Sequence, residues 1–377
     1  MPLTRHLYRE DEVIAALIFC ILRGRHVEAA FWCSEMIESE MIDELFSAMR
    51  RAWFYGVGIQ CLGWLRNVQA LGDAIEAERL LELVQQLSRA KKDRSPITLL
   101  ATDLSVQPDR VNADPAALAD SSNSLEQFVK LAVAQRRTTT AWGGLQACPE
   151  PDNLLKRLAM SKHGVAGAKA LKAIMADSGV WEARATACAA LCLSREEFLA
   201  SWAAEPQPLL REVAAALKDW GQLRPRQRRV YPVPPECLYY FTERGRTVSV
   251  YDSTEKEIMG RLEKPGALWG SVYWDSVADW QAVKTDDAVR EAFYAENFPD
   301  DCPDEWSKAD RAKSHGGGPL QRGAIPTLEI AMERLLGRLG SAVIWGKLPP
   351  VKKIDWTPVD INWNLTPVVS RLKIIID

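Results

Sequence analysis

The sequence has few of the residues from which most active sites and metal centres are built. Its 377 residues include only four histidines, which are His6, His26, His163 and His315. None stands at the spacing of a metal-ligand set or a catalytic triad, and the sequence has no G-x-S-x-G, P-loop or dinucleotide-binding glycine motif. We therefore expect no catalytic residues, no cofactor and no metal, and we predict that the protein is not an enzyme.

Several short patterns come near to a known site without completing it. His26-Val27-Glu28 matches the first half of a zinc deaminase signature, but the P-C-x-x-C half is absent. Cys188 and Cys192 lie four residues apart on one predicted helix, which favours two thiols facing the core over a metal site. The glycine run at 316–318 and the acidic turn at 300–305 are better explained by solvated loops than by phosphate or calcium sites.

The opening segment of the chain is apolar but too short to cross a bilayer. Val13 to Leu22 carries no charge, and a helix of that length rises only about 15 Å, roughly half of a hydrocarbon core. Acidic residues precede it and Arg23 follows it, which is unlike a signal peptide. We therefore expect a buried core helix and no membrane span.

The chain also lacks a strong excess of either charge. Its 47 lysines and arginines against 50 aspartates and glutamates give a formal net charge of −3, which provides no global attraction to nucleic acid or anionic lipid. Its eight cysteines are spread over the whole length, and several lie on apolar helical faces, where a free thiol behaves as a small hydrophobe. We therefore expect an intracellular protein in a reducing compartment.

Apolar residues that recur every three or four positions predict a helical first half. Gly24 is suited to end the first of these helices, and S-x-x-E/Q capping boxes begin two later ones, at Ser124 and Ser194. Residues 93–123, apart from a short helical turn, and 138–151 are predicted to be loops. The predicted helices are 9–23, 27–39, 42–53, 60–70, 74–92, 124–135, 153–160, 165–176, 180–192, 194–204 and 209–220.

The composition changes near Gly221, which divides the chain into three predicted regions. Residues 1–221 form an irregular array of antiparallel helix hairpins. Residues 222–346 form a smaller Trp/Pro-rich α+β region, with a strand at 247–251 and helices at 288–296 and 327–339. Residues 347–377 form an extended strap. The predicted fold class is therefore mainly α, with an irregular C-terminal α+β region and an extended tail.

A basic and aromatic cluster just after Gly221 is the candidate polyanion-binding site. Arginine guanidinium groups suit phosphates, and tyrosine rings can stack on bases. The same arginines could instead meet acidic groups of this chain or of another protein, so nucleic acid is possible but not favoured. The residues of the cluster are Arg224, Arg226, Arg228, Arg229, Tyr231, Arg244 and Arg246.

The C-terminal strap is the candidate protein interface. Apolar and polar residues alternate from Val359 to Leu365, which predicts a half-buried strand, while the surrounding prolines exclude a central strand of a broad sheet. Such a strap either folds onto its own helices or adds to a neighbouring subunit. The candidate interface residues are Trp345, Trp356, Val359, Ile361, Trp363 and Leu365.

The block HLYREDEVIAALIFCILRGRHVEAAFWCSEMIESEMIDELFSAMRRAW, residues 6–53, resembles a family of uncharacterised α-helical proteins encoded by large nucleocytoplasmic DNA viruses. The shared features are a basic-aromatic lead, an acidic R-E-D-E-V-like helix start and an E-A-x-F-W-like second helix. A weaker similarity is to the collar helices of clamp loaders, without their ATPase domain. The first resemblance implies a viral protein that works by contact, in the virion or at its assembly site.

These features favour a non-enzymatic structural or scaffold protein that acts through protein–protein contacts. The expected partners are other subunits, either copies of the same chain or viral proteins. The alternative is a nucleic-acid-associated replication or packaging factor that uses the cluster Arg224–Arg229.

Overall fold

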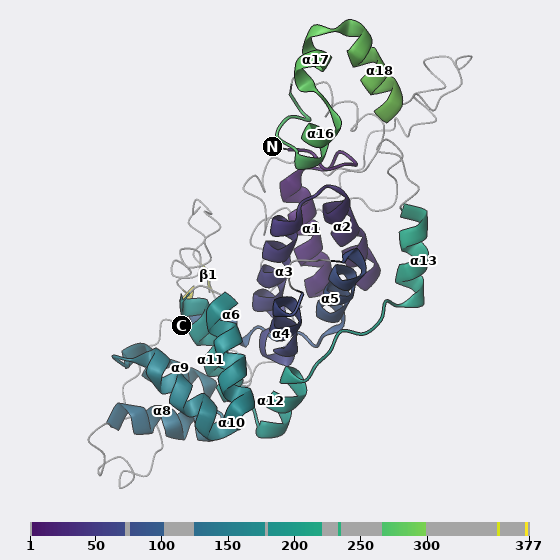
Figure 1. Ribbon diagram of the computed structural model, residues 1–377. Coiled ribbons are helices and arrows are strands. Elements are labelled where there is room, and N and C mark those ends of the chain that lie inside the picture. The colour runs from purple at the N-terminus through teal and green to yellow at the C-terminus, as the bar shows by residue number, and fades with distance from the viewer. Residues whose placement is uncertain are drawn as a thin grey trace. The chain divides into compact units, whose positions relative to one another are not determined.

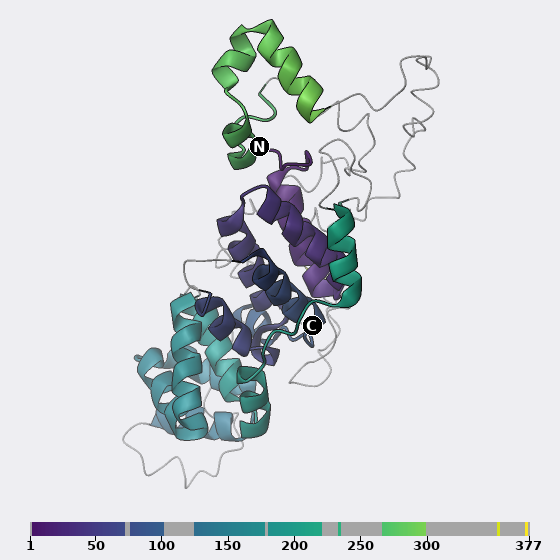
Figure 2. The same cartoon turned by 45° about the vertical axis from the view of Figure 1, so that its right-hand side comes forward.

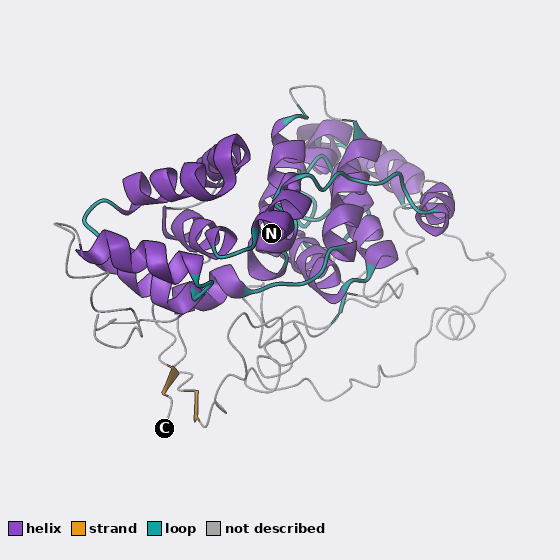
Figure 3. Cartoon of the chain, turned by 90° about the horizontal axis from the view of Figure 1, so that it is seen from below, coloured by secondary structure: helices purple, strands orange, loops and turns teal. Residues whose placement is uncertain are grey.

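The computed structural model describes residues 2–71, 76–101, 124–177, 180–220, 233–234 and 266–298, and two strand segments at 353–354 and 374–375. Within these ranges the chain folds into fifteen α-helices and one short 3-10 helix (Figures 1 and 3). The predicted mainly α fold class is therefore confirmed. The strands β1 (Lys353–Ile354) and β2 (Ile374–Ile375) pair antiparallel, with Lys353 opposite Ile375.

The chain divides into two compact units that alternate along the sequence. Unit 1 consists of Met1–Arg50, Glu76–Ser88 and Pro208–Arg334, and unit 2 consists of Arg51–Ile75, Arg89–Gln207 and Leu335–Asp377. The predicted region boundaries at residues 221 and 346 lie outside the described residues, as do the predicted elements at 247–251, 327–339 and 359–365.

Unit 1 begins with a helix hairpin. Helix α1 (Glu10–Arg23) is buried along its apolar run. It lies beside α2 (His26–Glu38), labelled in Figure 1 and turned by 45° in Figure 2. Gly24 joins them in the left-handed conformation, with φ of 70°, and the hydrogen bonds of its turn reach back to the carbonyls of Cys20 and Ile21. A residue with a Cβ is strained at this φ, so the predicted helix end at Gly24 is confirmed.

Two later helices complete the core of unit 1 around this hairpin. Helix α5 (Ala77–Arg89) comes after α3 (Ile42–Gly56) in the sequence. The side-chain amide of Gln85 in α5 donates a hydrogen bond to the carbonyl of Pro208 and accepts one from the N–H of Leu210. Helix α13 (Arg211–Trp220) then packs against α2, where the rings of Phe31 and Trp220 meet edge to face at 5.1 Å.

A separate group of three short helices follows in unit 1, within residues 266–298. These are α16 (Val272–Val277), α17 (Trp280–Thr285) and α18 (Asp287–Asn297). Each N-cap residue, Ser271, Asp279 or Asp286, accepts a backbone N–H through its side chain. The predicted helix at 288–296 is confirmed as α18. The other two were not predicted, because six residues are too few to show a helical period.

Unit 2 is built from helix hairpins. It contains η1 (Gly58–Gln60), α4 (Gly63–Gln69), α6 (Ser95–Ala101), α8 (Ser124–Ala134), α9 (Thr138–Ala147), α10 (Pro151–Asp177), α11 (Val180–Leu191) and α12 (Arg195–Trp202). The indole rings of Trp53 and Trp64 stack nearly parallel, 18° apart, with centroids separated by 6.2 Å. Trp53 also donates a hydrogen bond to the carbonyl of Cys61 at 3.0 Å.

The structure corrects the prediction that residues 138–151 form a loop, because α9 occupies most of that range. The threonines and glycines give this segment a low intrinsic helix propensity, but the stabilisation from packing on α8 outweighs that unfavourable propensity. A Cβ at Gly144 would lie only 2.6 Å from Val129 Cγ2 of α8, so the glycine permits the close approach of the two helices. Trp142 and Leu145 are then buried.

The two helices predicted at 153–160 and 165–176 form one element, α10, with a break between them. Gly164 has φ of 64° and ψ of −147°, a combination that is almost confined to glycine. On the first half, His163 is buried and stacks on Phe198 of α12, with ring centroids 3.9 Å apart and planes within 7°. The break therefore lies beside a buried aromatic contact.

Candidate functional site

The residues that sequence reasoning selected lie outside the described part of the structure. This holds for the candidate polyanion cluster from Arg224 to Arg246 and for the candidate interface from Trp345 to Leu365. Both therefore stay predictions. The functional surface has to be sought among the residues that the structure describes.

The histidine and cysteine patterns that were examined for catalysis are engaged in the fold. His26 begins α2, and its Nε2 lies 2.5 Å from Glu212 Oε1 of α13, while Glu28 pairs with Arg25 at 3.2 Å. Cys188 and Cys192 are both buried, as their spacing predicted. In the described ranges no three His, Cys, Asp or Glu side chains come together as a metal site requires. No helix in these ranges combines the length and apolar composition that a membrane crossing needs.

Burial makes four of the described cysteine thiols poor nucleophiles, because it disfavours the thiolate. It raises the pKa of Cys20, Cys33 and Cys188 well above the usual range and that of Cys61 to about 11. Cys192 differs from these four thiols, because its pKa is lowered, chiefly by a hydrogen bond from Cys188.

Two cations near Cys192 serve the end of its helix. Lys162 Nζ donates to the carbonyls of Leu191 at 2.6 Å and Val133 at 3.2 Å, and Arg136 Nε donates to the carbonyl of Cys192 at 3.2 Å. Cations in these positions satisfy the last carbonyls of a helix and oppose its dipole. The arrangement around Cys192 is therefore explained by the termination of α11.

The N-terminal loop of residues 2–9 folds back on itself before α1. Leu3 and Arg9 form an antiparallel bridge, and Thr4 and Tyr8 share a backbone hydrogen bond of 2.8 Å. Leu7 lies at the turn with φ of 68°, an unusual conformation for a bulky residue, and its side chain is fully buried. The surrounding structure must hold this strained turn in place.

Glu35 of α2 supplies that support. Its Oε1 accepts hydrogen bonds from Thr4 Oγ1 at 2.5 Å and from the His6 backbone N–H at 3.1 Å, and its Oε2 lies 2.6 Å from His6 Nδ1. All three residues are buried. A carboxylate that orients a histidine also occurs in acid–base catalysis. Here both carboxylate oxygens bind the N-terminal loop, so the cluster acts as an anchor.

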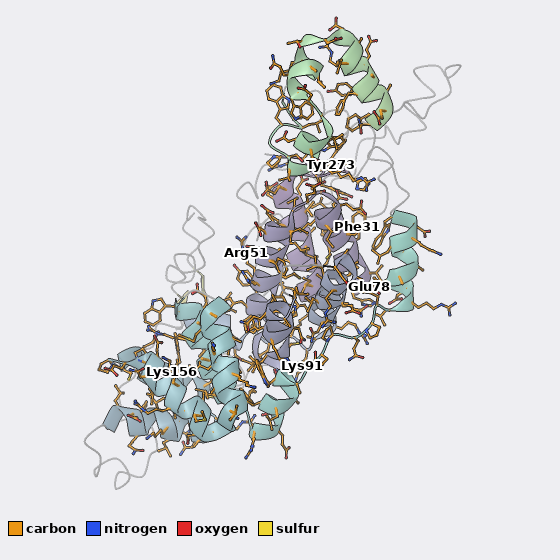
Figure 4. The ribbon with its side chains drawn as sticks, in the orientation of Figure 1. Phe31, Arg51, Glu78, Lys91, Lys156 and Tyr273 are labelled. Atoms are coloured by element: carbon orange, nitrogen blue, oxygen red, sulfur yellow. The ribbon has the colours of Figure 1, made fainter. Side chains whose placement is uncertain are left out.

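The aromatic segment of residues 266–298 is attached to the same loop. Trp274 is fully buried and its Nε1 donates to the carbonyl of Thr4 at 3.0 Å. The Arg5 guanidinium lies 5.9 Å from the centre of the ring of Tyr273, which is labelled in Figure 4. Trp274 also packs against Phe293 and Phe298, with centroids at 6.1 and 5.3 Å. Three short helices thus share a small aromatic core that rests on the N-terminal loop.

The exposed surface of this segment combines apolar side chains with negative charge. Its five exposed large apolar residues are Trp269 (46% exposed), Val272 (57%), Val277 (43%), Val289 (39%) and Tyr294 (36%). Residues 266–298 carry six carboxylates, all exposed, against two cations, a formal net charge of −4. We call residues 266–298 the acidic segment. Exposed apolar side chains on one short segment are typical of a contact surface.

Comparison with known proteins gives no relative from which a function could be transferred: no family model, no curated protein and no solved structure matches the chain.

Sequence reasoning missed both the anchor and the acidic segment. One signal for the anchor was available: Glu35 is one of five polar residues on the predicted second helix, which is otherwise apolar, and a carboxylate on a largely buried helix needs a partner. The acidic segment had a weaker signal, because its carboxylates are separated by apolar residues without a clear period.

Proposed function

We propose that the protein is a non-enzymatic scaffold that acts through protein–protein contacts. The observation that carries this proposal is the acidic segment, which is fixed to the fold through Trp274 while exposing five large apolar side chains. The resemblance of residues 6–53 to helical proteins of large DNA viruses extends the proposal to a virion or assembly component of such a virus.

The chemistry of the described residues agrees with a role in contact. The His6–Glu35 pair binds the N-terminal loop, and the cations near Cys192 cap a helix. These groups are occupied in holding the fold together, whereas the large apolar side chains of the acidic segment each keep at least 36% of their surface exposed, Trp269 with Lys284 over its ring at 3.4 Å.

The first experiment is size-exclusion chromatography with light scattering on the whole chain, with and without a mixed pool of DNA and RNA, at about 0.1 M salt. A mass above the 42.2 kDa of one chain that the nucleic acid leaves unchanged supports a scaffold. A monomer that gains mass only with nucleic acid contradicts the proposal. It favours the alternative, a replication or packaging factor that uses Arg224–Arg229.

A second experiment tests the predicted C-terminal interface. Deletion of Lys347–Asp377 is expected to lower the mass of the assembly or the stability of the chain. An unchanged mass together with an unchanged melting temperature shows that the strap contributes to neither, and contact would then have to run through other surfaces such as the acidic segment.

A further inference from the structure

Helix α10 has the opposite character to the acidic segment. Residues 153–176 contain five lysines or arginines and no aspartate or glutamate. Four of these cations are exposed, and two large apolar side chains, Met160 (52% exposed) and Val165 (64%), are exposed among them. We call this set of exposed side chains, which come from both halves of α10, the basic face; it consists of Lys156, Arg157, Met160, Val165, Lys169 and Lys172.

The helical period gathers these residues on one side of each half of α10. Before the break, Lys156, Arg157 and Met160 follow the i, i+1, i+4 positions of a single face. After Gly164, Val165, Lys169 and Lys172 follow the i, i+4, i+7 positions. The opposite sides hold buried residues such as Leu155 and Ile174. Each half therefore presents cations and one apolar side chain outward (Lys156 is labelled in Figure 4).

Some charges on both surfaces already have structural roles. On the basic face, Arg157 pairs with Glu126 at 2.9 Å. On the acidic segment, Asp279 and Asp286 cap helices, and Asp275 accepts a hydrogen bond from Trp280 at 2.6 Å. These contacts leave the formal charge counted for either surface unchanged. The two surfaces therefore carry opposite formal charges, and both expose apolar side chains that a partner can contact.

We propose that the acidic segment of one copy of this chain binds the basic face of α10 in a second copy. The proposal rests on the proposed scaffold function and deepens it, because it names the partner as the chain itself. It is argued from the complementary charge of the two surfaces and from the exposed apolar side chains that both would bury. Since the two surfaces differ, the contact is head to tail and leads to rings or open chains.

Charge-swap variants test this directly. Glu291→Lys/Glu296→Lys reverses two exposed carboxylates of α18, and Lys169→Glu/Lys172→Glu reverses two cations of the basic face. Each variant alone is expected to weaken self-association by about 100-fold, because each change brings the formal charge of one of the two surfaces to zero. Mixing the two variants restores association, since the unchanged acidic segment of Lys169→Glu/Lys172→Glu then meets the unchanged basic face of Glu291→Lys/Glu296→Lys.

A matched control separates this effect from a change in total charge. Glu78→Lys/Asp219→Lys reverses two exposed carboxylates elsewhere in unit 1 and changes the net charge by the same amount as Glu291→Lys/Glu296→Lys. It is expected to associate like the unchanged protein. Circular dichroism melting curves of all variants identify any that fail to fold, and the mixing experiment uses only folded ones.

The outcomes distinguish failure of this inference from failure of the proposed function. Association that survives both swaps, or swaps that mixing does not rescue, overturns the head-to-tail contact but leaves a scaffold that assembles otherwise. A monomeric chain whose Lys169→Glu/Lys172→Glu variant loses only binding to DNA, RNA or anionic vesicles also overturns it. In that case the basic face is a polyanion site. If the unchanged protein gains mass only when nucleic acid is present, that result also contradicts the scaffold proposal.

Discussion

Two regions of the molecule bury a histidine to the same degree and hold it in opposite ways. His6 in the N-terminal loop and His163 in α10 are each 3% exposed. His6 is held by the carboxylate of Glu35 and is part of a polar anchor. His163 lies flat on the ring of Phe198, and neither of its ring nitrogens makes a well-aligned hydrogen bond to another described residue.

The difference teaches that burial alone does not fix the role of a histidine. At His163, burial lowers the pKa to about 4, Lys162 and Arg195 add to this, and the Leu191 carbonyl offsets it only in part. The ring is therefore neutral at pH 7 and serves as an aromatic surface. At His6, the polar partner determines the role, because it fixes a strained backbone turn.

The first prediction concerns Glu35. Replacing it in Glu35→Ala leaves Thr4 Oγ1 and the His6 groups buried without their acceptor, so the free energy of unfolding should fall by about 3–5 kcal/mol. Urea denaturation measures this loss. The matched control on the same helix is Glu38→Ala, which removes a partly exposed ion pair with Arg5 and should cost less than about 1 kcal/mol. Equal losses for the two variants would show that the anchor is unimportant.

The second prediction concerns acid stability. Between about pH 6.5 and pH 4 the unfolded chain binds a proton at His163 that the folded chain does not, so stability falls as the pH falls through this window. The contribution is at most about 3 kcal/mol. His163→Phe removes the titrating group and keeps an aromatic ring against Phe198.

Urea unfolding of the variant and the unchanged protein at pH 7.5 and pH 4.5 checks this. The variant should lose clearly less stability on acidification than the unchanged protein. If both lose the same amount, other groups account for the acid sensitivity and His163 does not titrate as its surroundings imply.

The third prediction concerns the break next to His163. Gly164→Ala places a Cβ on a backbone that only glycine adopts readily, although a Cβ there would meet no other atom within 4 Å. The expected cost is about 1–3 kcal/mol in free energy of unfolding, measured by thermal or urea denaturation. A stabilised variant would mean that α10 straightens, which would also move His163 relative to Phe198.

The smallest expected effect concerns the helix that carries Phe198. Ser194 Oγ accepts the N–H of Glu197, and Glu197 returns a bond to the N–H of Ser194, the capping box that the sequence predicted. Ser194→Ala should cost about 1 kcal/mol. Ser161→Ala, at an exposed position within α10, is the control and should be nearly neutral. A cost at Ser161 equal to that at Ser194 would contradict a specific capping role.

Local signals predicted much of the fold. Gly24 ends the first helix because a left-handed turn suits glycine, and Ser194 begins α12 because its hydroxyl can accept the N–H of Glu197. Helix α9 could not be predicted in this way. Its stability comes from the close approach of Gly144 to α8. This is a tertiary packing contact, which the local sequence of α9 alone does not reveal.

The candidate site was less accessible to sequence reasoning. The partner of His6 lies 29 residues away on the neighbouring helix, and only the hairpin geometry brings the two together. The basic face could be read as a run without carboxylates, but its exposure depends on which side of α10 packs inward. The residues that were selected for their composition, from Arg224 to Arg246 and from Trp345 to Leu365, await their test.

The stacked indoles of unit 2 have a practical consequence for spectroscopy. Trp53 and Trp64 are at most 1% exposed, so their fluorescence emission belongs to an apolar, water-free environment. Opening of unit 2 wets both rings at once and shifts their emission to longer wavelength. Unit 1 carries its own buried indoles, Trp32 and Trp274 among them. Replacing the buried tryptophans of one unit with phenylalanine would let the unfolding of the other unit be followed by its own tryptophan fluorescence.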